Sequence, residues 1–256
     1  SLASLGEPIA LYSRTKSLVD KREISTTTLG ESEGRLPDGA LQITTFPDTP
    51  TPGKSNYLPV RNVVINEVLT HTDPPFEDAI ELRNLSTEPV NIGNWWISNS
   101  ESNRNKFQIP ANTILSARGV TAFYEAQFNP APGADHSFAL NSAHGGKVIV
   151  SQTDSSGQLT GYRAIAEYDA SENGVSFGRV KTSIGDQFVT LASPTFGVDN
   201  PSSLSAFRQG SGAPNSTAKV GPVVIHEIMY HPAPLPLGAG TPDDEFIELH
   251  NNTNTT

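Results

Sequence analysis

Hydrophobic positions along the chain come in short runs in which apolar and polar residues alternate. In the stretch AIELRN at residues 79–84, Ile80 and Leu82 alternate with polar neighbours, which is the period of a half-buried β-strand. A β-branched, apolar run at 62–70 precedes it, so we expect the two runs to form an antiparallel hairpin. Further short runs follow, each ended by Gly, Pro, Asn or Asp, and no stretch shows sustained helical periodicity. The pattern predicts an all-β fold of the sandwich or barrel kind.

Part of this sequence pattern occurs twice in the chain. GRLPDGALQITTFPDTPTPGKSN at residues 34–56 and GRVKTSIGDQFVTLASPTFGVDN at residues 178–200 have the same length. They share Gly-Arg at the start, Pro-Thr-x-Gly near the end and a final Asn, which pairs Gly34 with Gly178 and Asn56 with Asn200. A repeat at this spacing is a domain rather than a solenoid unit.

Two further pairs of similar segments extend the repeat. VVINEV from Val63 returns as VVIHEI from Val223, and IEL at 80–82 returns at 247–249. GEPIALYS from Gly6 is similar to GGKVIVSQ from Gly145. We therefore expect four parts: the C-terminal part of one sandwich (1–57), a complete copy (61–200), a flexible linker of small residues (201–219) and the N-terminal part of a further copy (221–256). Unpaired strand edges in the two partial copies predict self-association through them.

The complete copy contains a series of motifs that is similar to those of a known family. The series INEV, FEDAIELRN, VNIGNWWIS, NKFQIP and TILSARG, followed by GGKVIV, SFGR and SPTFG, resembles the lamin-tail domain family in its bacterial form. The resemblance covers residues 61–200, and pieces of it cover both ends of the chain. It implies an immunoglobulin-like β-sandwich that occurs, often in tandem, in large secreted or surface proteins of bacteria.

The resemblance also carries expectations about function. It implies a non-catalytic interaction or structural module, extracellular or at the cell surface, with a protein or a cell-surface polysaccharide as partner. Such domains often neighbour secreted hydrolases, nucleases or spore-coat-type kinases, so the alternative interpretation is an accessory or targeting module that positions an enzyme. Sequence outside residues 1–256 decides between the two.

Composition excludes several classes of function. The 256 residues include no Cys, so disulfides, thiolate zinc sites and cysteine nucleophiles are ruled out. The 17 Lys and Arg against 27 Asp and Glu give a net charge of −10, which repels phosphate backbones and makes nucleic acid an unfavourable partner. No apolar run is long enough to span a bilayer, so we expect no transmembrane segment.

Acidic residues gather along the first hairpin, and their oxygens are the ligands that Ca²⁺ prefers. The candidate metal ligands are Glu67, His71, Asp78 and Glu81, and a metal-dependent hydrolase built on them is a third, weaker hypothesis. The Gly-punctuated calcium loop is missing, and alternating carboxylates on a strand are more often its solvated face. We therefore predict no cofactor, with Ca²⁺ as the open alternative.

Two other motifs are candidates for a metal site or a ligand contact. HEIMYH at 226–231 has one residue too many for the H-E-x-x-H zinc signature and stands in a predicted strand rather than a helix. Trp95 and Trp96 are adjacent, so in a strand they point to opposite faces; one is expected in the core, and Trp96 is a candidate for stacking on a sugar or a protein. No nucleophile and base stand at a motif-defining spacing, so we predict that the chain is not an enzyme.

Overall fold

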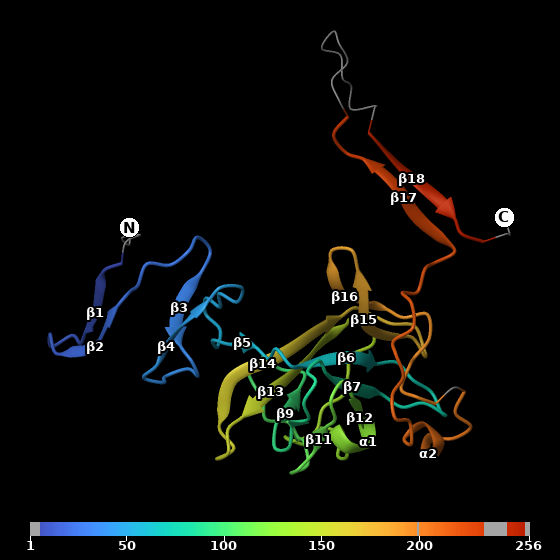
Figure 1. Ribbon diagram of the computed structural model, residues 1–256, viewed down its shortest axis with the longest axis horizontal. Helices are drawn as coiled ribbons and strands as arrows, with labels where there is room; N and C mark the ends of the chain where they lie inside the picture. Colours follow the sequence, from blue (N-terminus) through green and yellow to red (C-terminus); the bar gives the residue numbers. More distant parts are fainter. Residues whose placement is uncertain (1–5, 199, 233–244, 254–256) are drawn as a thin grey trace, which may run out of the picture.

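The computed structural model describes residues 6–198, 200–232 and 245–253. Strands dominate it, as the sequence predicts (Figure 1). The first sheet has the order β10 (Phe107–Gln108), β9 (Trp96–Ser98), β13 (Gly146–Thr153), β14 (Leu159–Tyr168) and β5 (Leu58–Pro59). The second has the order β12 (Val120–Tyr124), β7 (Ala79–Asn84), β6 (Val63–Leu69), β15 (Ser176–Thr182) and β16 (Gly185–Thr190).

The remaining strands form two-stranded pairs. They are β1 (Pro8–Tyr12) with β2 (Leu18–Glu23), β3 (Ser32–Arg35) with β4 (Ile43–Phe46), β8 (Val90–Asn91) with β11 (Ile114–Leu115), and β17 (Val223–Met229) with β18 (Phe246–Asn251). Two single-turn helices, α1 (Glu125–Phe128) and α2 (Leu204–Phe207), are too short to leave a periodic signal in the sequence. In Figure 1 the β1–β4 pairs and the β17–β18 hairpin lie on different sides of the central sandwich.

The two five-stranded sheets pack face to face around one hydrophobic core. Its buried members come from both sheets and from the loops that close the ends: Val60, Val63, Ile65, Val68, Ile80, Leu82, Ile92, Trp95, Ile97, Ile109, Leu115, Phe123, Phe128, Phe138, Leu140, Val148, Val150, Ala164, Ala166, Tyr168 and Phe177. Side chains alternate across each strand, so one face of each sheet supplies this core. The predicted β-sandwich is confirmed.

A bulge at Asn66 sets the phase of β6. Ile65 lies opposite Leu82 and Glu67 lies opposite Glu81, so Asn66 is an extra residue on the β6 side. Such a residue shifts the alternation by one position. Val63, Ile65 and Val68 can therefore all face the core, which a strict period of two does not allow.

The outer face of the second sheet is covered by residues 192–198 and 200–219, here called the strap. Phe207 of α2 is 1 % exposed and packs edge-on against the rings of Phe76, Tyr124 and Phe196. Arg208 forms an ion pair with Glu77, with Nη2 donating to Oε2 at 2.7 Å. The small, polar composition of 201–219 predicted a flexible linker, but one buried aromatic residue and many polar contacts fasten this segment to the sandwich instead.

The β3–β4 hairpin repeats the glycine and asparagine contacts of β15–β16. Gly34 lies opposite Thr44 and Gly178 opposite Val189, so β15–β16 has one more residue between these partners than β3–β4 has. Asn56 Nδ2 donates to the Arg35 carbonyl (3.0 Å), and Asn215 Nδ2 donates to the Arg179 carbonyl (2.9 Å). A Cβ on either glycine would press on the corresponding amide, at 2.8 Å from Asn56 and 2.9 Å from Asn215.

The structural counterpart of Asn56 is therefore Asn215, and the pairing of Asn56 with Asn200 was wrong. The strap places α2 between the Pro-Thr-x-Gly element, which includes Pro194 and Thr195, and this asparagine. A comparison of equal-length segments has no gap and cannot detect such an insertion.

The β17–β18 hairpin repeats β6–β7 in the same way. Ile225 lies opposite Leu249 and Glu227 opposite Glu248, with the extra residue at His226, which is the position of the bulge in β6. His226 Nδ1 lies 2.9 Å from Glu248 Oε1, as Asn66 Nδ2 lies 2.6 Å from Glu81 Oε1. Residues 226–229 of HEIMYH are thus on a strand, as predicted, while Tyr230 and His231 follow its end.

Candidate functional site

Two of the predicted metal ligands, Glu67 and Glu81, lie opposite each other beneath the strap. Both are 0 % exposed, so the expectation that they form a solvated strand face was wrong. Glu67 accepts hydrogen bonds from Ser176 Oγ (2.6 Å) and from the Thr195 backbone N–H (2.9 Å) and hydroxyl. Asn66 Nδ2 donates to Glu81 Oε1, while Glu81 Oε2 is buried without a hydrogen-bond partner.

Burial controls the protonation of this pair. It raises the pKa of Glu81 to about 8, the negative charge of Glu67 adds to the rise, and the bond from Asn66 opposes it. Burial also raises the pKa of Glu67, against the hydrogen bonds from Ser176 and Thr195. At neutral pH Glu81 therefore holds a proton, and a neutral carboxyl group is a poor ligand for a cation.

Asp78 and His71 lie apart from that pair. Thr72 Oγ1 donates to Asp78 Oδ1 at 3.0 Å, and burial raises the pKa of Asp78 to about 7, with Glu125 contributing. His71 Nδ1 lies 2.9 Å from the Ser171 carbonyl. Over the described residues, no three His, Cys, Asp or Glu side chains gather in a way that could hold a metal ion. The four candidate ligands thus form no single centre, and Ca²⁺ binding stays a prediction.

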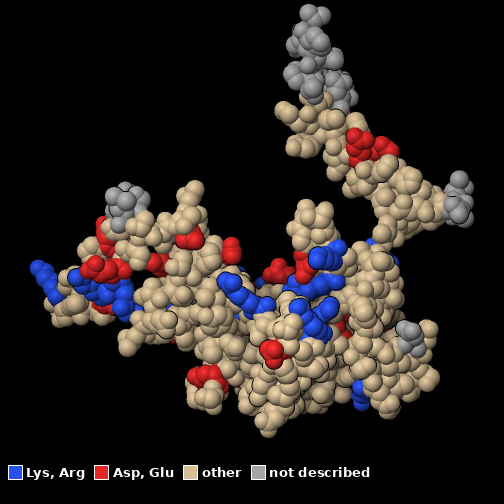
Figure 2. All heavy atoms as spheres, in the orientation of Figure 1, with Lys and Arg blue, Asp and Glu red and all other residues tan. Residues whose placement is uncertain are grey.

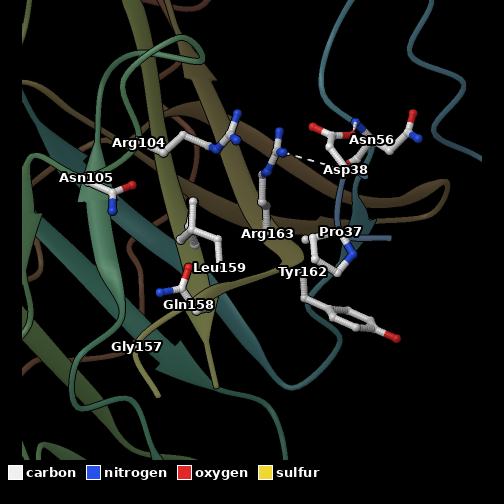
Figure 3. Close-up of a pocket in the computed structure, with 12 residues that line it drawn as sticks. Pro37, Asp38, Asn56, Arg104, Asn105, Gly157, Gln158, Leu159, Tyr162 and Arg163 are labelled. Atoms are coloured by element: carbon white, nitrogen blue, oxygen red, sulfur yellow. Dashed lines mark hydrogen bonds between the residues drawn. The ribbon is translucent and has the colours of Figure 1, made fainter. Parts of the chain in front are cut away.

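A groove that the sequence did not reveal lies between the first sheet and the N-terminal part of the chain (Figure 3). Its volume is about 320 Å³. We call it the arginine groove, and its lining residues are Pro37, Asp38, Asn56, Arg104, Asn105, Ser151, Gly157, Gln158, Leu159, Gly161, Tyr162 and Arg163. Figure 3 shows Arg104 and Arg163 side by side, facing Asp38 and Asn56.

Arg163 joins the N-terminal part of the chain to the sandwich. It is 6 % exposed, its Nη2 donates to the Asn56 carbonyl (3.2 Å), and its guanidinium lies 5.2 Å from the centre of the Tyr57 ring. Burial lowers its pKa to about 10, with the neighbouring charge of Arg104 acting in the same direction. Since that pKa is still far above neutral pH, Arg163 keeps its positive charge.

Unused hydrogen-bonding groups stand beside these charges. Arg104 donates Nη1 to the Glu101 carbonyl (2.9 Å), but its Nε is buried without a partner. Ser151 is 2 % exposed, and its hydroxyl also has no partner. The lining contains no His and no nucleophile–base pair. This arrangement suits binding of an anionic, oxygen-rich group rather than its chemical conversion.

A comparison with protein families classifies the sandwich. Residues 59–173 match the model of the Lamin Tail Domain family. This lamin-tail match begins in β5, ends just before β15 and so leaves the strap and the two terminal hairpin regions outside it. The lamin tail domain is a non-enzymatic domain with an immunoglobulin-like β-sandwich, in agreement with the fold described above. No curated protein and no solved structure matches the chain.

Trp95 and Trp96 take opposite faces of the sandwich, as predicted. Trp95 is 4 % exposed and belongs to the core. Trp96 is half-buried, its ring centre lies 6.3 Å from that of His136, and its indole N–H is buried without a partner. Trp96 is thus partly covered by His136 and not an open stacking platform, and its role as a ligand contact stays a prediction.

A second hollow, of about 650 Å³, shares Arg104 and Arg163 with the arginine groove. Lys147 lies in it, with Nζ 2.6 Å from Glu101 Oε1 and 2.9 Å from Glu167 Oε1. Figure 2 shows Lys and Arg side chains gathered over the central sandwich, although the chain as a whole is acidic. None of the described helices is long and apolar enough to cross a membrane.

Proposed function

We propose that the chain belongs to a tandem of lamin-tail sandwiches and serves as a non-catalytic interaction and structural module of a larger secreted or cell-surface bacterial protein. The observation that carries this proposal is the recurrence of hairpin features. On one side of the sandwich β3–β4 repeats the glycine and asparagine contacts of β15–β16, and on the other β17–β18 repeats the register of β6–β7, including the bulge. Repetition of one unit is a way to build spacing and multivalent contact rather than a single active centre.

The arginine groove is the place where such a module would meet a ligand. Its paired guanidinium groups favour carboxylate or sulfate oxygens, which an acidic cell-surface polysaccharide presents in series. A protein that displays carboxylates is the second class of partner. The net charge of −10 around this local positive site disfavours long phosphate backbones.

Titration of the purified chain with an acidic and a neutral polysaccharide, followed by isothermal calorimetry, tests this function. We expect binding of the acidic polymer that weakens as salt is raised, and none of the neutral polymer. Arg104→Gln should weaken binding by about tenfold or more, because a charge-assisted hydrogen bond is lost. Arg14→Gln, at an exposed arginine outside the groove, is the matched control.

Equal binding of both polymers, or equal loss in the two variants, would remove the groove from the proposal. Turnover of any polysaccharide by the chain alone would contradict a non-catalytic role. The alternative function, an accessory module that positions a secreted hydrolase, nuclease or kinase, uses the same groove. Fractionation of producing cells with an antibody against residues 61–200 tests the location, and enzyme assays on the captured protein separate the alternative.

A further inference from the structure

Among the unpaired strand edges in the part of the chain that the structure describes are those of β17 and β3. β17 pairs with β18 alone, and β3 pairs with β4 alone. The β17–β18 hairpin also exposes its apolar side chains, and Ile225, Ile228 and Ile247 are 61 %, 54 % and 64 % exposed. An open strand edge next to an exposed apolar face is a template for strand addition.

The sandwich itself shows what pairs with such an edge. β6, the counterpart of β17, pairs antiparallel with β15, the counterpart of β3. In that ladder Gly178 lies opposite Glu67 and Phe177 lies opposite Val68. The structure therefore contains a template for the missing contact.

Side chains reinforce that template. Glu67 accepts bonds from Ser176 Oγ and from Thr195, as described above. Arg179 Nε donates to the Ile65 carbonyl (2.8 Å), and Asn215 Nδ2 donates to the Asn66 carbonyl (3.1 Å). Four donors on the β15 side thus meet three consecutive residues of β6.

The same groups are present on the two unpaired edges. The donors Ser176, Arg179, Thr195 and Asn215 correspond to Ser32, Arg35, Thr51 and Asn56 around β3. The acceptors correspond to the Glu227 carboxylate and the carbonyls of Ile225 and His226 on β17. Every member of the contact has a counterpart of the same chemical kind.

We propose that β17 of one copy of this chain adds antiparallel to the free edge of β3 of a second copy, with Gly34 opposite Glu227 and Glu33 opposite Ile228. The inference rests on the tandem proposed above. Ser32 Oγ and Thr51 then donate to Glu227, and Asn56 donates to the His226 carbonyl. The apolar residues Ile9 and Leu11 of β1, counterparts of the core residues Val148 and Val150, come to cover the face of β17–β18.

A second copy is the partner because the two edges of one chain lie on different sides of its sandwich (Figure 1). Each copy offers one β3 edge and one β17 edge, so the contact is heterologous and each added copy leaves both a β3 edge and a β17 edge free. The expected products are head-to-tail oligomers whose length grows with protein concentration.

Sedimentation velocity of the full chain over a range of concentrations tests this. Ser32→Asp places a carboxylate beside Glu227, where the Ser32 hydroxyl would donate, and Ile228→Asp places one opposite Glu33, so each variant alone should be monomeric, with association at least about tenfold weaker. Ser155→Asp and Ile184→Asp introduce the same charges at exposed turns away from both edges and should associate like the parent chain.

Mixing the two variants gives the decisive result. The Ser32→Asp chain keeps an intact β17, and the Ile228→Asp chain keeps an intact β3, so an equimolar mixture should form dimers that do not grow further. A parent chain that is monomeric throughout, association that Ser32→Asp leaves unchanged, or a mixture without dimers would each overturn the inference.

Hydrogen exchange separates that failure from failure of the tandem itself. If the monomeric chain protects the amides that form hydrogen bonds between β17 and β18, the repeated register stands and only the contact between copies is lost. If those amides are unprotected, the hairpin does not hold the register of β6–β7, and the tandem proposal fails with it.

Discussion

The hairpins β6–β7 and β17–β18 have the same register and opposite burial. Ile65, Val68, Ile80 and Leu82 are all 0 % exposed, whereas their counterparts Ile225, Ile228, Ile247 and Leu249 are 54 % to 64 % exposed. Both hairpins bulge at the same position, and in both the bulged residue contacts a glutamate on the partner strand. The register therefore does not depend on the core.

This difference separates what specifies a hairpin from what stabilises it. Cross-strand pairs and the bulge select one register in either setting. A hairpin gains stabilising free energy from the burial of its apolar side chains only where other parts of the protein cover its faces. The second layer of the sandwich and the strap do this for β6–β7. A two-stranded hairpin alone is marginal in water, so β17–β18 depends on a covering layer for its stability.

The largest expected effect comes from removing the same side chain in both settings. Ile80→Ala should lower the free energy of unfolding of the sandwich by about 3 to 4 kcal/mol, because it leaves a cavity in a packed core. Ile247→Ala should change it by less than about 0.5 kcal/mol, because that side chain is 64 % exposed. Urea unfolding followed by tryptophan fluorescence measures both, since Trp95 reports on the core. Equal losses would mean that the two hairpins share one core.

The stability of the sandwich should depend on pH through Glu81. The pKa of Glu81 is raised to about 8 in the folded protein, so the folded state holds this proton more tightly than the unfolded state. The resulting stability is complete below the pKa of an unfolded glutamate and is lost as pH rises through about 8. Between about pH 5 and about pH 9 we expect a loss on the order of 2 to 4 kcal/mol.

Glu81→Gln tests that expectation, because the amide stays neutral at every pH. The variant should lose most of the slope, and the remainder should come from Asp78 and Glu67, whose pKa values are raised in the same direction. Glu248→Gln, at the exposed counterpart, should keep the full slope. Melting curves across the pH range measure all three proteins, and a slope that Glu81→Gln leaves intact would assign the effect to other groups.

Much of the fold could be predicted from the sequence, because its signals are local. Alternation at Ile80 and Leu82 predicted the strand at 79–84, turn residues predicted where the strands end, and recurring segments predicted the internal repeat. The resemblance to lamin-tail domains over 61–200 is supported for 59–173. The bulge at Asn66 was not predicted, because one extra residue in a short apolar run leaves no periodic signal.

The candidate sites were harder to predict, because they depend on the strap and on contacts between distant segments. Glu67 and Glu81 look solvated when β6 and β7 are considered alone, and only Phe207 and its neighbours bury that face. Arg104 and Arg163 are far apart in sequence and meet through the packing of the first sheet against the N-terminal segment. No motif spacing connects them.

A smaller effect distinguishes the two asparagines that cover equivalent glycines. Asn215 donates to the carbonyls of Asn66 and Arg179, both within the sandwich. Asn215→Ala leaves these groups without that donor and should lower the free energy of unfolding by about 1 to 3 kcal/mol. Asn56→Ala removes the equivalent bond to Arg35 outside the sandwich, so the main unfolding transition should stay within about 0.5 kcal/mol of the parent. Urea titrations of both variants measure the difference.

Calcium should have the smallest effect of all. A cation that binds the folded state raises its stability in proportion to its affinity, so a real site would appear as a higher melting temperature. Glu67 is occupied by hydrogen bonds from Ser176 and Thr195, Glu81 is neutral near pH 7, and neither lies in a group of three ligands among the described residues. The melting temperatures measured with millimolar CaCl₂ and with a chelator should therefore be the same. A saturable rise that Glu67→Gln removes would place a calcium site under the strap after all.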